Sequence, residues 1–403
     1  MTLYEDLKWR GLIKDVAGEK LEDILNGKPI TFYWGTDPTA DSLHIGHYSS
    51  LVTAKRLANY GHHPILLCGG STGLIGDPRP TAEREILPVE TIRNNIEGIK
   101  NQINKIFDGK AELVNNYDWT KDYTYLEFLR DIGKYINVNY MLGKDIISRR
   151  LETGITYAEF SYMLLQGYDF MWLYEHKNCI LQCEGSDQWG NITTGIELIR
   201  KKLNKEAYGF TMPLILDANG NKFGKSEGNA LWLDKNKTSP FEIYQYLINS
   251  DDSKVEEYLK VFTFLTKDEI DNIMLKQNEK PELRIAQKAL AYEVVKDLHG
   301  VEEAELAKTK SEDIFNNKGN SANTEKKNID KNLIENGINI LDLLMLTELF
   351  ESKSDARRMV EQNAVSLNNE KITDKDKIIT LNDFKDNELL IQKGKKKFIK
   401  LVV

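Results

Sequence analysis

The chain has 403 residues, with 54 Lys and Arg against 62 Asp and Glu and a formal net charge of −8. This length exceeds what one typical hydrophobic core supports, so we expect two or three domains. The acidic balance excludes a protein coated with cations for nonspecific nucleic-acid binding, so any contact with RNA should be local.

No stretch approaches the ~20 consecutive apolar residues that a membrane helix needs, and the N-terminus, with Glu5 and Asp6, lacks the basic-then-apolar pattern of a secretion signal. We therefore expect a soluble, cytoplasmic protein with no membrane partner. Cys68, Cys179 and Cys183 cannot form a disulfide framework and lack the spacing of a zinc site. We expect no structural zinc and no other metal held by protein ligands alone.

Residues 1–29 predict one or two amphipathic helices, and residues 30–47 then combine a strand, a turn and a helix start. The apolar run 30–34 predicts a short strand, which Pro38 helps to end. Asp41 or Ser42 is suited to cap the helix that follows.

Two histidines open that helix. His44 and His47 are three residues apart and share a face, while Gly46 between them leaves the backbone bare, so a flat base could lie on it. In an open parallel sheet this junction lies at the carboxyl ends of the strands, where helix N-termini receive phosphates. The pattern fits a nucleotide site, but so short a match fits an ordinary capped helix equally well.

Strands and helices alternate from residue 30 to residue 216, which is typical of a doubly wound parallel sheet. The predicted elements after the first helix are a strand at 64–68, a glycine-rich turn at 69–78, a helix at 92–106, a strand at 111–114, a helix at 156–175, a strand at 179–184, a helix ending near 203 and a last strand at 211–216.

The helix at 156–175 carries an unusual polar face. Thr156 and Glu159 predict a capping box at its start. Tyr162, Gln166 and Asp169 follow at i, i+4 and i+7, and so lie on one face. A solvated surface explains such a face in many proteins, but a tyrosine, an amide and a carboxylate in one row also suit a polar ligand.

A cationic loop follows the last predicted strand. Residues 222–226 read Lys-Phe-Gly-Lys-Ser and come just after the turn at Asn219 and Gly220. Two lysines beside a glycine and a hydroxyl suit a polyphosphate. One such lysine pair alone is more often solvated surface.

The early histidine–glycine turn and the late lysine loop together resemble the two signature motifs of the class I aminoacyl-tRNA synthetases, in their order and spacing. Within that class the chain resembles the tyrosyl-tRNA synthetases over nearly its whole length, at residues 33–47, 69–78, 160–170, 185–191, 222–226 and in the C-terminal module. The resemblance implies activation of L-tyrosine by ATP to tyrosyl-adenylate and pyrophosphate, followed by transfer of tyrosine to the terminal ribose of tRNA(Tyr).

The resemblance also implies a tyrosine site. In it Tyr33 and Asp169 hold the phenol, and Asp77, Tyr162 and Gln166 hold the α-ammonium group; Gly35, Asp37 and Gln188 complete it. Elementary chemistry agrees, because a phenol needs a donor and an acceptor at its hydroxyl and an ammonium group needs acceptors.

For ATP, the resemblance implies catalytic groups on both loops: Thr39 and His44 on the first, and Lys222, Lys225 and Ser226 on the second. ATP would contact Gly46, His47, Gly185 and Asp187 together with Lys222 and Lys225. The tyrosine carboxylate is already a nucleophile, so the first step needs donors and positive charge around the phosphates and no general base. Mg²⁺ would arrive with ATP, without a dedicated protein site.

The domain expectations are a Rossmann-like catalytic domain over residues 1–233, an α-helical tRNA-contacting domain over 234–315, a polar linker over 316–336 and a small α+β domain over 337–403. The last resembles an RNA-binding domain shared with a small-subunit ribosomal protein. Within it we expect helices at 341–350 and 354–363, short strands near 364–367 and 371–372, and a closing hairpin at 389–403. Candidate tRNA contacts are Arg357, Arg358, Lys395, Lys396 and Lys397. Relatives are symmetric dimers, so the resemblance implies a homodimer.

Three alternatives share part of this pattern. A tryptophanyl-tRNA synthetase has both motifs, but an indole has no evident use for Tyr33 with Asp169, and that relative lacks the C-terminal module. Another nucleotidyltransferase would have the histidine motif without the tail. A nonenzymatic RNA-binding relative would keep the tail and lose groups such as Thr39, His44 and Lys222.

Overall fold

The computed structural model divides into two compact units, Met1–Ala304 and Glu305–Val403. It describes residues 1–79, 84, 86–226, 229–316, 326–350, 352–368, 370–385, 387–394 and 397–403. Each unit is described by itself.

A six-stranded sheet forms the centre of the first unit, in the order β1-β6-β5-β2-β3-β4. The strands are β1 (Val16–Ala17), β2 (Thr31–Thr36), β3 (His63–Cys68), β4 (Glu112–Asn115), β5 (Cys179–Gly185) and β6 (Tyr208–Met212). All neighbours are parallel except β1 and β6. This confirms the predicted doubly wound parallel sheet, with a short antiparallel strand added at one edge.

The strand order places a crevice between β2 and β5. From β2 the chain moves outward through β3 and β4, and it then returns to lay β5 and β6 on the other side of β2. Ligands of open α/β sheets bind at the carboxyl ends of the strands where the order reverses. The candidate site is therefore expected between the ends of β2 and β5.

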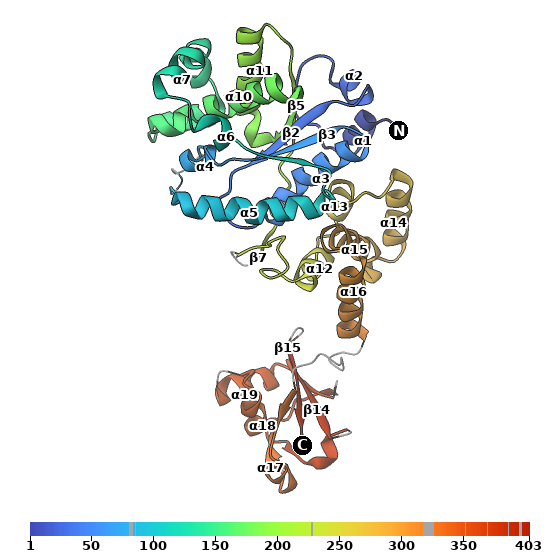
Figure 1. Cartoon of the computed structure of the whole chain (residues 1–403). Coiled ribbons are helices and arrows are strands. Elements are labelled where there is room, and N and C mark those ends of the chain that lie inside the picture. Colours follow the sequence, from blue (N-terminus) through green and yellow to red (C-terminus); the bar gives the residue numbers. More distant parts are fainter. Residues whose placement is uncertain are drawn as a thin grey trace. The chain divides into compact units, whose positions relative to one another are not determined.

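Helices cover both faces of the sheet. Figure 1 shows α3 (Ile45–Asn59) and α5 (Val89–Ile106) on one side and α10 (Tyr157–Lys177) and α11 (Trp189–Leu203) on the other. The remaining helices of this region are α1 (Leu3–Trp9), α2 (Leu21–Asn26), α4 (Thr72–Ile75), α6 (Tyr117–Thr120), α7 (Tyr125–Asp131), α8 (Val138–Leu142) and α9 (Asp145–Leu151). The apolar stripe of α5 is buried as its period predicts, at Ile92, Ile96, Ile99, Ile103 and Ile106.

The cap of α3 differs from the prediction. The helix begins at Ile45 and its N-cap is His44, so the expectation of Asp41 or Ser42 as the cap was wrong. The Ser42 hydroxyl is buried, donates to the carbonyl of Leu43 at 2.8 Å and accepts from Gln102. Serine is a favoured N-cap residue, but here these hydrogen bonds already use the Ser42 hydroxyl.

Two other predicted details differ. The Thr156 side chain accepts from the Glu159 N–H, but the Glu159 carboxylate pairs with Arg150 at 2.8 Å, so half of the capping box is replaced by a buried ion pair. The last strand spans 208–212, not 211–216, because Pro213 has no N–H to donate to a ladder.

Helices alone build the rest of the first unit, as the sequence predicts: α12 (Pro240–Ile248), α13 (Val255–Phe262), α14 (Lys267–Glu279), α15 (Ile285–His299) and the start of α16 (Val301–Asn316). A short ribbon of β7 (Lys225–Ser226) and β8 (Asn229–Ala230) precedes them. No helix among the described residues is long and apolar enough to cross a membrane.

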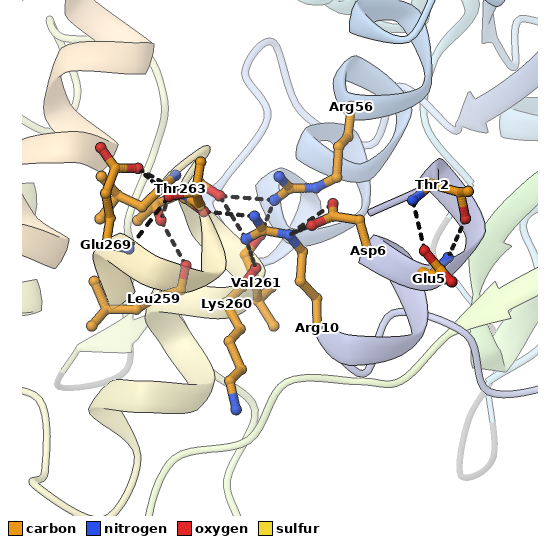
Figure 2. Close-up of polar contacts among 12 residues, drawn as sticks. Thr2, Glu5, Asp6, Arg10, Arg56, Leu259, Lys260, Val261, Thr263 and Glu269 are labelled. Carbon is orange, nitrogen blue, oxygen red and sulfur yellow. Dashed lines mark hydrogen bonds and ion pairs between the residues drawn. The ribbon is translucent and has the colours of Figure 1, made fainter. Parts of the chain in front are cut away.

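Two buried arginines join α1 and α3 to the carboxyl end of α13 (Figure 2). Arg10 donates to the carbonyls of Lys260, Thr263 and Leu265 at 2.8, 3.2 and 2.6 Å. Arg56, in the last turn of α3, donates to the carbonyls of Val261 and Thr263 at 3.3 and 2.9 Å. These cations satisfy carbonyls that a helix end leaves unpaired, and they favour its negative dipole end.

The second unit contains a five-stranded sheet, in the order β12-β11-β14-β15-β9. Its elements are β9 (Lys326–Asn328), α17 (Asn332–Glu335), β10 (Ile338–Asn339), α18 (Ile340–Leu346), α19 (Lys353–Glu361), β11 (Val365–Leu367), β12 (Glu370–Lys371), β13 (Ile378–Ile379), β14 (Glu388–Lys393) and β15 (Lys397–Val402). The predicted closing hairpin is confirmed as β14 and β15. Because β9 pairs with β15, part of the stretch 316–336 belongs to this sheet.

Candidate active site

Buried polar groups of β2, β5 and α10 gather at the candidate site. Tyr33 and Asp169 are each 1% exposed. The Asp169 carboxylate accepts from Asn116 Nδ2 and Trp119 Nε1, both at 2.9 Å. Burial raises the pKa of Asp169 to about 7, although both hydrogen bonds favour the charged form.

The Tyr33 hydroxyl and both amide atoms of Gln182 make no hydrogen bond of standard geometry among the described residues, but the two side chains lie within weak hydrogen-bonding reach of each other. Buried polar groups are nearly always paired, so such weakly paired atoms require an explanation. Gln182 lies opposite Tyr33 in the register of β5 against β2. The pocket therefore has donors and acceptors available for a polar ligand.

Sequence reasoning missed Gln182, Asn116 and Trp119. Gln182 and Glu184 interrupt an apolar strand, and an amide at a fully buried strand position was the available signal for Gln182. Asn116 and Trp119 lie beyond β4, and nothing in their spacing pointed to Asp169.

Asp37 lies at the carboxyl end of β2 and is bound on both oxygens. Tyr162 donates its hydroxyl to Oδ2 at 2.9 Å, and Thr72 donates to Oδ1 at 2.7 Å. Two predicted site residues, from β2 and from the polar face of α10, thus meet directly.

Asp77 is the centre of an amide network. It accepts from Gln188 Nε2 at 2.8 Å and from Asn191 Nδ2 at 3.3 Å, and Asn191 also donates to Gln166 Oε1 at 2.9 Å. Burial raises the pKa of Asp77 to about 7. No ion pair with Asp77 occurs within the part of the chain that the structure describes. Acceptors outnumber donors here, which suits an ammonium group.

The histidines of the first loop form one stacked unit. Their rings lie 3.8 Å apart between centroids, with 19° between their planes. The Gly46 N–H donates to His44 Nδ1 at 3.1 Å, and the His44 N–H donates to His47 Nδ1 at 3.3 Å. Burial lowers the pKa of His47 to about 3, so this imidazole is neutral near pH 7.

The structure brings the lysine loop onto the start of α3. A Cβ on Gly224 would lie 3.3 Å from the Gly46 nitrogen and 2.1 Å from Ile45 Cγ2, so only glycine fits this close approach, at φ +91°. Leu231 donates its N–H to the Gly224 carbonyl and accepts from the Ile45 N–H. Phe223 anchors the loop against the rings of Tyr246, Tyr258 and Phe262, with centroids 5.3, 4.6 and 4.9 Å away.

Thr39 and Lys222 are both exposed. The backbone of Lys225 and Ser226 forms β7, but their side chains lie outside the described part of the structure.

At the end of β5, a Cβ on Gly185 would lie 2.7 Å from Asp187 Oδ1, so the Asp187 carboxylate folds over this glycine. The Gly35 N–H donates to Glu184, a buried carboxyl that sequence reasoning missed.

The candidate tRNA contacts belong to the second unit. Arg357 is exposed, and Arg358 donates to Asp355 at 2.7 Å. Lys397 is exposed at the start of β15, while Lys395 and Lys396 lie outside the described residues.

Comparisons with known proteins are consistent with this arrangement. Residues 25–316 match the family model of class I tRNA synthetases (W and Y), and residues 322–401 match the C-terminal domain of the tyrosine–tRNA ligase SYY-like type. The chain is 47% identical to the tyrosine–tRNA ligase of Staphylococcus carnosus over 98% of both chains. It is 44% identical to that of Porphyromonas gingivalis over the full length of both.

The chain belongs to the tyrosyl-tRNA synthetase family. A truncated mitochondrial tyrosyl-tRNA synthetase of Aspergillus nidulans superposes with a TM-score of 0.69 at 35% identity, covering 78% of this chain and 94% of that one. A tryptophanyl-tRNA synthetase of Encephalitozoon cuniculi, at 16% identity and a TM-score of 0.55, shares the fold. Membership of this family confirms the predicted enzyme class, and ATP is a substrate of class I synthetases.

Proposed function

We propose that the chain attaches tyrosine to tRNA(Tyr) through the site between β2 and β5. The carboxylate of L-tyrosine attacks the α-phosphorus of ATP, the bond to the β-phosphate oxygen breaks, and pyrophosphate leaves. The terminal ribose hydroxyl of tRNA(Tyr) then attacks the tyrosyl carbonyl and AMP leaves. This activity belongs to protein synthesis, and we propose that the chain carries it out in the cytoplasm.

The observation that best supports tyrosine as the amino acid is the set of buried polar groups around Tyr33 and Asp169. Among the described residues the Tyr33 hydroxyl has only a weak contact with Gln182, and Asp169 is an acceptor already oriented by Asn116 and Trp119. A phenol would complete both groups, whereas phenylalanine would leave them buried and unpaired at a cost of about 1–3 kcal/mol each. Indole donates through one N–H and accepts nothing, so tryptophan would leave Tyr33 unsatisfied.

The opposite end of the pocket suits the α-ammonium group. Asn191 donates to both Asp77 and Gln166, and the oxygens of these two side chains can accept further hydrogen bonds. Tyr162 donates its hydroxyl to Asp37 in the same part of the site. Gln188 holds Asp77 in place, and Gly35 borders the same space at the end of β2. A cation here would restore charge to carboxyls that burial otherwise drives toward the neutral form.

The two loops would hold ATP. The stacked imidazoles of His44 and His47 and the bare backbone at Gly46 suit the adenosine and its phosphates, and we assign Lys222, Lys225 and Ser226 of the other loop to the phosphates. Thr39, His44, Lys222, Lys225 and Ser226 stabilise the charge that develops on the leaving phosphates. Gly185 and Asp187 border the ribose. Mg²⁺ would be carried in by the polyphosphate oxygens of ATP.

The partners are tRNA(Tyr) and a second copy of the chain. The basic groups Arg357, Arg358, Lys395, Lys396 and Lys397 would contact phosphates of the tRNA. Homodimer formation agrees with large apolar side chains exposed on the first unit, among them Tyr125 at 63%, Leu126 at 76% and Tyr157 at 62%. Such exposure favours a covered surface.

ATP–pyrophosphate exchange with each amino acid in turn tests this function. Exchange with tyrosine alone, together with charging of tRNA(Tyr), is the expected result. Exchange with tryptophan in place of tyrosine would assign the pocket to the other branch of class I. The absence of exchange with every amino acid would mean that the chain has lost catalysis and acts by binding RNA.

A further inference from the structure

Glu184 is a carboxyl group at the candidate site that the functions described above leave unused. It is the last residue but one of β5, it is 4% exposed, and it accepts a hydrogen bond from the Gly35 N–H of β2. The side chain thus bridges β2 and β5 where the strand order reverses and a ligand is expected.

Glu184 has no cationic partner. None of the ion pairs among the described residues includes it, and its charged neighbours are Asp187 and Asp37. Burial, with these neighbouring carboxylates, raises the pKa of Glu184 well above its usual range. A buried carboxyl with one backbone hydrogen bond is costly unless something else uses it.

The chemistry of a carboxyl group limits what it can contact. The raised pKa of Glu184 favours the neutral acid, whose free oxygen can accept or donate a hydrogen bond, so the best partner is a group that can do both or a donor. The substrates offer three kinds of donor: the α-ammonium group, the adenine amino group and the ribose hydroxyls. The ammonium group already has acceptors around Asp77, which lies after β3 and not on β5.

The position of Asp187 distinguishes the remaining donors. Its carboxylate folds over Gly185, the residue after Glu184, and it is close enough to raise the pKa of Glu184, so two acidic groups lie near each other at the end of β5. A ribose presents two adjacent hydroxyl donors, which matches two neighbouring carboxyls. An acidic side chain that binds a ribose hydroxyl beside the sheet crevice is a common solution in doubly wound folds.

We propose that Glu184 accepts a hydrogen bond from a ribose hydroxyl of ATP, beside Asp187, and thereby selects ribonucleotides over deoxyribonucleotides. The proposal rests on the ATP site proposed above. The Gly35 N–H holds one carboxylate oxygen, which leaves the other for the sugar. The side chain is oriented before ATP arrives, so little conformational freedom is lost on binding.

The test compares ATP, 2′-deoxy-ATP and 3′-deoxy-ATP in tyrosine-dependent pyrophosphate exchange, for wild type, Glu184→Ala and Glu184→Gln. We expect the wild type to prefer ATP over one of the two analogues. Glu184→Ala should reduce that preference in kcat/KM about tenfold, the size expected for one buried hydrogen bond. KM for tyrosine should stay unchanged. Glu184→Gln, whose amide still reaches the Gly35 N–H, should also lose preference.

Glu175→Gln is the matched control, because Glu175 is an exposed carboxylate in the last turn of α10, which precedes β5. An unchanged preference for ATP over both analogues in the two Glu184 variants would overturn the proposal. So would a parallel rise in KM for tyrosine and ATP, which indicates a purely structural role. If the wild type shows no tyrosine-dependent exchange, the proposed function fails instead, and the two failures are distinguishable.

Discussion

Asp77 and Asp169 are buried carboxyls whose pKa values burial raises to about 7, and their charge therefore depends on pH in the physiological range. In the empty site, lower pH protonates Asp77, but an ammonium group needs its ionised form. The apparent Kd for tyrosine should then rise about tenfold between pH 8 and pH 6.

Isothermal titration across this range, in buffers of different ionisation enthalpy, measures the effect and the accompanying proton release. Asp77→Asn should bind tyrosine weakly with little pH dependence. A Kd for the wild type that stays flat from pH 8 to pH 6 would contradict the role of Asp77.

The second prediction at the residue scale concerns the hydroxyl of Tyr33. Tyr33→Phe keeps the ring and removes the hydroxyl, so kcat/KM for tyrosine should fall about tenfold while that for phenylalanine stays equal or rises. Tyrosyl-tRNA synthetases as a class discriminate by about 10⁵-fold without editing, a magnitude taken over from that class. Tyr60→Phe, at a half-exposed tyrosine on the surface, is the control. An unchanged ratio in Tyr33→Phe would mean that the phenol lies elsewhere.

At the scale of elements, the lysine loop and the start of α3 form one unit, because Gly224 fits against Gly46. Lys222 is exposed, and we assign it to the charge that develops on the leaving phosphates, so it should act mainly on the transition state. Lys222→Ala should lower the rate constant of adenylate formation about 10²-fold, with the Kd for tyrosine unchanged. Stopped-flow fluorescence separates the two quantities. Weaker tyrosine binding of the same magnitude would argue against this role.

The arginines at the end of α13 make a stability prediction. Arg56→Met removes the cation but leaves the carbonyls of Val261 and Thr263 buried, so the free energy of unfolding should fall by about 2–4 kcal/mol. Denaturant unfolding measures it. Arg200→Met is the matched control, because Arg200 is exposed and its ion pair among the described residues is with Glu197, so its loss should leave the free energy of unfolding nearly unchanged. Equal effects would show that Arg56 is not a buried anchor.

The strands and helices themselves could be predicted largely from sequence. A continuous apolar run identified β3, which is buried on both faces, and apolar residues at helical period identified α5 and α11, which each bury one face. The details that failed depend on tertiary contacts. Gln102 draws Ser42 away from the helix start, and β9 is only three residues long in a polar stretch, so neither leaves a local signal.

For the site, the sequence motifs were sufficient for residues on loops, whereas residues on strands were harder to find. Gln182 and Glu184 lie in β5 among apolar neighbours, and only the strand order shows that they face the crevice. That the lysine loop meets α3 also cannot be read from local pattern, since the two stretches are distant in sequence and periodicity carries no long-range information.

At the scale of the whole molecule, the two compact units suggest separable tasks. The described site residues for tyrosine and ATP all lie in Met1–Ala304, while the basic residues proposed for tRNA lie in Glu305–Val403. A chain ending at Asn316 should therefore keep tyrosine-dependent pyrophosphate exchange within about twofold and lose most charging of tRNA(Tyr). Equal loss of both activities would show that the second unit is needed for adenylation as well.

The central claim is that one buried site binds the phenol of tyrosine, so that the carboxylate of that tyrosine reacts with ATP. A rapid-quench measurement of pyrophosphate release, with ATP and a single amino acid in the absence of tRNA, tests this most directly. We predict a burst with tyrosine and no burst with phenylalanine or tryptophan at the same concentration. A burst of equal size with phenylalanine would contradict the claim, because the hydroxyl partners Tyr33 and Asp169 would then have no part in selection.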